Sequence, residues 1–235
     1  MAPARRRIRA VVFDLDDTLY LERRYVRGGF SAVGEFLRQK LGGAPGREPF
    51  EDWMWRRFLA GRRSNMFDAL SRRFALGLGR RGVAELVEVY RGHRPTIRPC
   101  RGVEDLLAEM RRSRLRLGLL TDGFLPAQRL KLRALALERH FHAVVFTERL
   151  GRDAWKPSPR GFELARRKLS VPHAACAYVA DNPAKDFLAP NRLGWLTVQW
   201  RRRGQVHAHN APPAAGRPRR VVRSGPELLR LLRTS

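Results

Sequence analysis

The chain has 235 residues, of which 48 are Lys or Arg and 22 are Asp or Glu, so its formal net charge is +26 at pH 7. This length is typical of one substantial domain, or of a core domain that carries a smaller insertion. Two cysteines without framework spacing argue against a secreted disulfide scaffold and indicate a reducing compartment. No run of about 18 apolar residues occurs, so we expect no membrane span.

Arginine supplies nearly all of the positive charge. The lysines are Lys40, Lys131, Lys156, Lys168 and Lys185. The arginines are scattered along the chain and no nucleic-acid recognition motif accompanies them, which argues against nucleic-acid binding as the main role. A positive surface also steers small anions toward a protein, so an anionic substrate fits the charge equally well.

The first part of the chain predicts one strand and then a block of helices. Residues 8–13 are rich in β-branched side chains and predict a buried strand. From about residue 21 to residue 90 the apolar residues follow helical spacing, and we find no strand pattern. One helix face is formed by Val26, Phe30, Val33 and Leu37. Glycine and proline at 42–46 predict the end of this first helix.

Strand and helix patterns alternate in the second part of the chain. Strands are predicted at 115–123, 142–147, 176–182 and 195–200, and helices at 103–112, 126–137, 158–169 and 184–194. This alternation predicts βαβ units and a mostly parallel sheet. Residues 201–218, rich in Gly, Pro, Ala and Arg, predict a mobile loop, and 226–232 a short final helix.

Polar side chains follow four of the predicted strands. In chain order they are Asp14 and Asp16, then Thr121 and Asp122, then Lys156, and finally Asp181, Asn182 and Asp186. Ligands of open α/β sheets bind beyond the carboxyl ends of the strands, so we expect these side chains to meet at one edge.

This set of residues suits phosphoryl chemistry. Clustered carboxylates without a histidine or cysteine partner are ligands for a hard cation such as Mg²⁺, which would offset their mutual repulsion. An aspartate can attack phosphorus and form an aspartyl-phosphate. A second carboxyl group two residues later can protonate the leaving oxygen and then activate water. Thr121 and Lys156 could donate to the phosphoryl oxygens.

The chain resembles the haloacid dehalogenase-like (HAD) superfamily of phosphatases in four motifs, which occur in the family's order. They are DLDDT at 14–18, LLTDG at 119–123, KPSP at 156–159 and DNPAKD at 181–186. The helical block lies between the first two motifs, where the family has its cap. Four motifs in order are far more specific than any one of them. In one departure, Ala180 stands where the family usually has glycine, and we expect its methyl group to affect metal affinity through Asp181.

The resemblance implies an α/β fold, in which a Rossmann-like parallel-sheet core at 1–20 and 92–235 carries an inserted all-helical cap domain at 21–91. It implies that Asp14 is the nucleophile and Asp16 the general acid and base. The implied phosphate-binding residues are Thr121, Asp122 and Lys156. The implied Mg²⁺ ligands are Asp14, Asp181 and the backbone carbonyl of Asp16, with outer support from Asp186 and Asn182.

We therefore expect a cytoplasmic, Mg²⁺-dependent phosphatase that acts on a small phosphorylated metabolite, of the nucleotide or sugar phosphate class. A dehalogenase of the same fold would need neither the metal nor Asp16, which favours phosphoryl chemistry. A phosphotransferase would differ only in its acceptor. The alternative from another class is a basic protein that binds RNA or another polyanion on a HAD scaffold.

Overall fold

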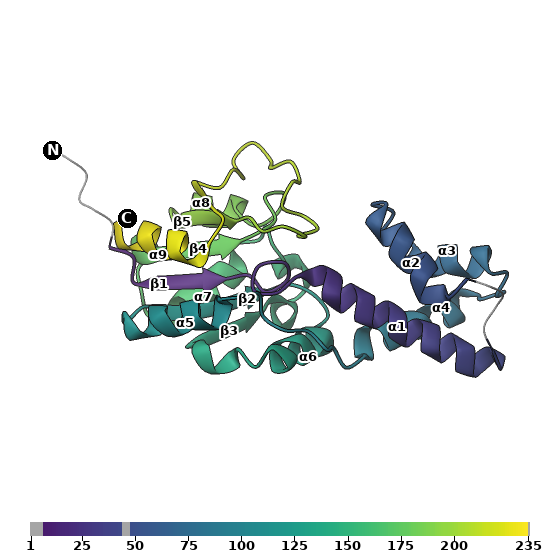
Figure 1. Ribbon diagram of the computed structural model, residues 1–235. Coiled ribbons are helices and arrows are strands. Elements are labelled where there is room, and N and C mark those ends of the chain that lie inside the picture. Colours follow the sequence, from purple (N-terminus) through teal and green to yellow (C-terminus); the bar gives the residue numbers. More distant parts are fainter. Residues whose placement is uncertain (1–6, 44–47, 235) are drawn as a thin grey trace. The chain divides into compact units, whose positions relative to one another are not determined.

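The computed structural model describes residues 7–43 and 48–234 (Figure 1). The chain forms two compact units: a helical unit at Arg24–Thr96, and a core unit made of the described residues on either side of it. The predicted helix end at 42–46 lies partly outside the described residues, and the first helix ends at Leu41. Within residues 7–43 and 48–234, no helix combines the length and apolar composition needed to cross a bilayer.

A parallel sheet organises the core unit. Its strands are β1 (Ala10–Phe13), β2 (Arg116–Thr121), β3 (Ala143–Phe146), β4 (Cys176–Ala180), β5 (Leu196–Trp200) and β6 (Arg220–Val222). They lie in the order β3-β2-β1-β4-β5-β6, and every neighbouring pair is parallel. The sequence did not predict β6. It has three residues in an arginine-rich stretch, and its pairing with β5 rather than any local pattern makes it a strand.

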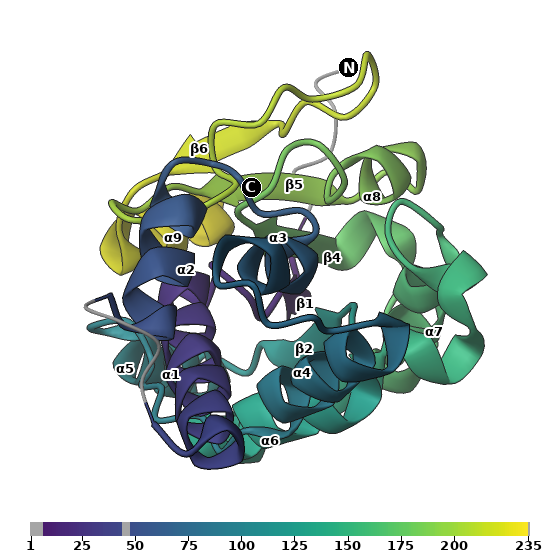
Figure 2. The ribbon, with the colours of Figure 1, turned by 90° about the vertical axis from the view of Figure 1, so that its right-hand side faces the viewer.

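Helices cover both faces of the sheet, as the βαβ alternation predicts. They are α5 (Val103–Arg112), α6 (Leu125–Leu135), α7 (Arg160–Leu169), α8 (Leu188–Arg192) and α9 (Gly225–Thr234). Short 3₁₀ turns lie at Glu138–His140, Thr147–Leu150, Arg152–Ala154 and His173–Ala175. In Figure 2, α5 and α9 lie to the left of the strands, and α7 and α8 lie to the right. β1 and β4 are buried along their whole length, and their sequences are continuous apolar runs for that reason.

Three large aromatic side chains fix α7 against the sheet. The Phe162 ring centroid lies 4.9 Å from that of Tyr178 and 5.7 Å from that of Trp195, edge to face in both cases. All three side chains are completely buried. Phe162 of α7 thus packs directly against Tyr178 of β4. This contact holds in place the strand that Asp181 directly follows.

The helical unit has its own apolar interior. Its helices are α1 (Glu22–Leu41, of which the first residues belong to the core unit), α2 (Phe50–Leu59), α3 (Met66–Arg73) and α4 (Arg80–Gly92). All four residues of the predicted α1 face are buried, which confirms that prediction. A side chain at Gly29 would place its Cβ 2.4 Å from ring carbons of Tyr90, so only glycine permits this approach of α1 and α4. The α/β core with an inserted all-helical domain is confirmed.

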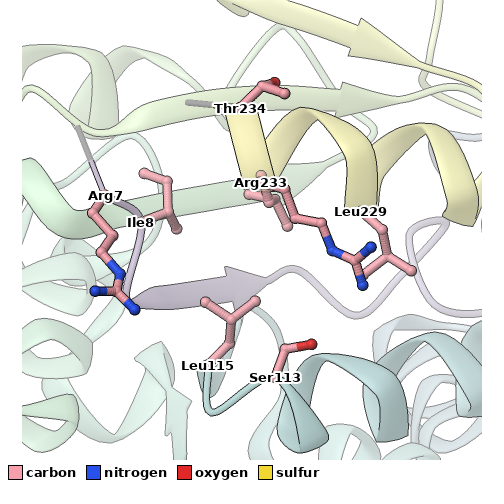
Figure 3. A pocket seen from close by; sticks show the side chains of 8 residues that line it. Arg7, Ile8, Ser113, Leu115, Leu229, Arg233 and Thr234 are labelled. Carbon is pink, nitrogen blue, oxygen red and sulfur yellow. The ribbon is translucent and has the colours of Figure 1, made fainter. Parts of the chain in front are cut away.

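A cavity of about 370 Å³ lies at the amino end of the sheet (Figure 3). It is lined by Arg7, Ile8, Ser113, Leu115, Leu229, Leu232, Arg233 and Thr234. Ile8 and Leu115 precede β1 and β2, so this cavity is at the edge opposite to the polar residues that follow the strands.

Candidate active site

Residues from three of the predicted motifs meet in one buried ion cluster. Asp14 directly follows β1, and its backbone N–H donates to the carbonyl of Val179 in β4 at 3.0 Å. The Lys156 ammonium donates to the Asp14 carboxylate, to Asp186 Oδ1 at 2.8 Å and to the Tyr178 hydroxyl at 3.1 Å. The Lys156 side chain is only 1% exposed. The fold therefore brings the first, third and fourth motifs to one point.

Negative charge exceeds positive charge in this cluster. Burial raises the pKa of Asp14 to about 7, although the charge of Lys156 opposes the rise and that of Asp186 adds to it. Burial alone would lower the pKa of Lys156, but Asp14 and Asp186 hold it well above its ordinary value. Lys156 therefore stays an ammonium, and its positive charge can attract the oxygens of an anion, which would take the place of one of its present partners.

Asp16 is held at both of its carboxylate oxygens. Oδ1 accepts hydrogen bonds from Lys131 Nζ at 2.8 Å and from the Tyr20 hydroxyl, and Oδ2 accepts one from Gln128 Nε2 at 2.8 Å. Burial acts to raise the pKa of Asp16, but the charge of Lys131 and the bonds from Gln128 and Tyr20 outweigh it and lower this pKa. The side chain is 23% exposed, so it can still be approached from solvent.

The second motif contributes one hydroxyl group and one structural carboxylate. The buried Thr121 hydroxyl accepts a hydrogen bond from Gln128 Nε2 at 2.7 Å and donates a long bond of 3.5 Å to the Asp122 carbonyl, which a phosphoryl oxygen could replace as acceptor. The Asp122 carboxylate accepts bonds from the Thr147 hydroxyl at 2.7 Å and from the backbone N–H of Lys156 at 3.2 Å. Asp122 therefore fixes the third-motif loop with its side chain.

Asp181 has the surroundings of a cation ligand. Its side chain is buried, and no described group donates to its Oδ2 atom. Burial, together with the charges of Asp186 and Asp14, raises its pKa well above the ordinary value. A buried carboxylate oxygen without a donor, close to two other carboxylates, is what a bound Mg²⁺ would satisfy. The residues present thus fit the expected ion.

The ligand set that the resemblance implies has two carboxylates and a carbonyl, from Asp14, Asp181 and Asp16. The described part of the chain holds no group of three His, Cys, Asp or Glu side chains placed to bind a metal. The two remaining predicted residues brace the fourth-motif turn. Asp186 Oδ2 accepts the Asn182 N–H at 3.0 Å, and Asn182 Oδ1 accepts the Ala184 N–H at 3.1 Å.

The segment between β5 and β6 is tied to the first motif through Asp17. This buried residue has a φ of 56° and accepts the N–H of Glu22 at 2.7 Å and that of Val206. Its carbonyl accepts Gln205 Nε2 at 2.7 Å. Asp17 is thus a structural residue at the start of α1. Residues 201–219 contain no helix or strand, and the expected mobility of 201–218 stays a prediction.

Comparison with known proteins identifies the family. Residues 8–194 match the family model described as haloacid dehalogenase-like hydrolase. The chain belongs to this family. It is 30% identical to the glyceraldehyde 3-phosphate phosphatase of Methanopyrus kandleri over 202 residues. These aligned residues are 83% of this chain and 84% of that protein. The resemblance to the HAD superfamily and the prediction that the chain is an enzyme are therefore confirmed.

Two further proteins illustrate the range of the similarity. The phosphoserine phosphatase of Thermus thermophilus is 40% identical over 101 residues, which are 43% of this chain and 39% of that protein. The crystal structure of a HAD phosphatase from Thermococcus onnurineus shares the fold, with a TM-score of 0.63 and 24% identity over 97% of this chain and 99% of the other.

Some site residues of this HAD-like hydrolase were not predicted from the sequence. They are Tyr20, Gln128, Lys131, Tyr178, Lys185 and Gln199. The sequence pattern could have indicated two of them, Gln128 and Lys131. Both lie on the buried face of α6, whose other members are Ala127, Leu132 and Leu135. Polar residues at apolar-face spacing indicate a polar contact inside the fold. For the other four we find no such pattern.

Proposed function

We propose that this HAD-like hydrolase is a Mg²⁺-dependent phosphatase that cleaves a small phosphate monoester through an aspartyl-phosphate on Asp14. The observation that carries the proposal is the pairing of buried Asp14 with Lys156, with Asp16 held two residues further on. The relatives named glyceraldehyde 3-phosphate phosphatase and phosphoserine phosphatase support a small ester as substrate. The sequence has two cysteines without framework spacing, which supports action in the cytoplasm.

In the first step, a carboxylate oxygen of Asp14 attacks phosphorus and the bond to the ester oxygen breaks. In its protonated form, Asp16 gives a proton to this leaving oxygen. The Thr121 hydroxyl and the Lys156 ammonium donate to the phosphoryl oxygens and stabilise the charge that develops on them.

In the second step, Asp16 takes a proton from water, which attacks the phosphorus of the aspartyl-phosphate. The bond from phosphorus to Asp14 breaks, inorganic phosphate forms, and the Asp14 carboxylate is regenerated. When bound by Asp14, Asp181 and the Asp16 carbonyl, Mg²⁺ supplies positive charge that lets an anionic nucleophile approach an anionic substrate.

The test is phosphate release from a panel that includes glyceraldehyde 3-phosphate, phosphoserine, nucleoside monophosphates and sugar phosphates. We expect turnover that EDTA abolishes and Mg²⁺ restores, and none from Asp14→Asn. The Asp153→Asn variant is a matched control, because Asp153 is an exposed carboxylate outside the site. Turnover by Asp14→Asn at the wild-type rate would refute the mechanism.

Two control assays test the alternatives in parallel. Chloride release from 2-chloropropionate without metal would indicate a dehalogenase. Tight RNA binding that weakens steeply with salt, without phosphate release, would indicate a polyanion-binding protein.

A further inference from the structure

We infer that Lys131 and Gln128 of α6 are positioning residues that clamp the Asp16 carboxylate and couple it to Thr121. This inference rests on the proposed function, because it concerns how Asp16 is aimed during proton transfer. It adds two residues outside the four motifs to the site.

The clamp fixes Asp16 from a different part of the chain. Asp16 lies in the loop after β1, whereas Lys131 and Gln128 lie on α6, which follows the loop that carries Thr121. Lys131 Nζ is 2.8 Å from Oδ1 of Asp16, and Gln128 Nε2 is 2.8 Å from Oδ2. Because Lys131 holds one oxygen and Gln128 holds the other, the carboxylate cannot rotate without breaking a bond.

Three of the four acceptor sites on Asp16 are occupied. An ionised carboxylate has about four lone-pair positions, and Lys131, Tyr20 and Gln128 take three of them. The remaining position is on Oδ2, where a proton can pass to the leaving oxygen or from water. The clamp therefore selects one oxygen of Asp16 for the chemistry.

Gln128 also links the proton-transferring group to the phosphate-binding group. Its amide nitrogen is within hydrogen-bond distance of Asp16 Oδ2, of Thr121 Oγ1 at 2.7 Å and of the Asp122 carbonyl. If the Gln128 amide were flipped, its oxygen would face the Asp16 carboxylate and the Asp122 carbonyl, which are also acceptors. The amide nitrogen must therefore face these two groups. Gln128 is 2% exposed, and water therefore does not replace these bonds.

The use of lysine supports a specific role for Lys131. Lysine is rare in this chain, with 5 among 48 basic residues, yet Lys131, Lys156 and Lys185 all lie within ion-pair distance of motif carboxylates. An ammonium is a compact charge that fits a narrow buried niche, whereas a guanidinium has five donors to satisfy. Lys168, on the exposed side of α7, offers a matched control.

The leaving-group dependence of kcat/KM tests the inference. The wild type, Lys131→Met and Gln128→Met are compared on p-nitrophenyl phosphate, whose leaving group needs little protonation, and on phenyl phosphate, whose leaving group needs more. A misplaced general acid costs about 100-fold where protonation matters. We expect both variants to lose about 100-fold on phenyl phosphate and under about 5-fold on p-nitrophenyl phosphate. Lys168→Met should keep the wild-type kcat/KM on both substrates.

A double-mutant cycle separates this role from general damage to the fold. If Lys131 and Gln128 act through Asp16, then neither substitution should lower activity further in an Asp16→Asn background. Equal losses on both substrates, or losses that add to that of Asp16→Asn, would overturn the inference and leave the proposed function standing. A wild type that hydrolyses neither these two esters nor any member of the metabolite panel would overturn the proposed function itself, and the inference with it.

Discussion

Replacing Asp14 by asparagine should abolish turnover and, at the same time, make the metal-free protein more stable. Asp14 is buried next to Asp186, and burial raises its pKa from 3.8 to about 7 despite the ion pair with Lys156. A difference of about 3 in pKa corresponds to about 4 kcal/mol. This is the free energy that folding loses when Asp14 must be ionised in the folded state, and a neutral asparagine of the same shape does not lose it.

The sign of the pH dependence follows from the raised pKa. Below about pH 4 the carboxyl group is protonated in both the folded and the unfolded chain, so wild type and variant should be equally stable. Between about pH 4 and pH 7 the unfolded chain releases the proton that the folded chain keeps, and the wild type becomes progressively less stable than Asp14→Asn. The advantage of the variant should be about 1–2 kcal/mol at pH 5 and about 4 kcal/mol above pH 7.

Thermal and urea unfolding in EDTA, followed by circular dichroism near pH 5 and pH 8.5, measures this difference. For a chain of this size 4 kcal/mol corresponds to a rise in Tm of about 8–16 °C. Adding Mg²⁺ should stabilise the wild type and narrow the gap. Asp153→Asn, at a side chain that is 74% exposed, should change stability by less than about 1 kcal/mol. The reasoning would be refuted if Asp14→Asn were less stable than the wild type near pH 8.5, or if the difference in stability between the two proteins did not change with pH.

Three other outcomes are expected. Phe162→Ala should lower the free energy of unfolding in urea by about 3–5 kcal/mol, because a completely buried ring is removed; a loss under about 1 kcal/mol would contradict the packing described. Gln199→Met removes the side-chain donor to the buried carbonyls of Asp181 and Ala208. It should lower the free energy of unfolding by about 1–3 kcal/mol and weaken Mg²⁺ binding in calorimetry. An unchanged Mg²⁺ affinity would argue against a link between Gln199 and the metal site. Burial raises the pKa of the Cys176 thiol to about 12, so a thiol reagent near pH 8 should find at most one reactive cysteine in the folded chain and two after unfolding.

The sequence by itself determined the architecture and the residues that follow the strands. Burial on both faces makes β1 and β4 continuous apolar runs, and glycine, proline and polar clusters mark where strands and helices end. In a parallel sheet the carboxyl ends lie at one edge, so the order of strands and helices along the chain is enough to predict that Asp14, Lys156 and Asp186 meet.

Only the tertiary structure decided which charges pair. Asp16 and Lys131 are 115 positions apart, and Lys156 and Asp14 are 142 positions apart, so no local spacing indicates either ion pair. The short β6 likewise exists because β5 offers it a free edge. Local patterns report burial and backbone preference, because these depend on neighbours in the chain. The partner of a buried charge depends on which elements pack together, and this is set by the whole fold at once.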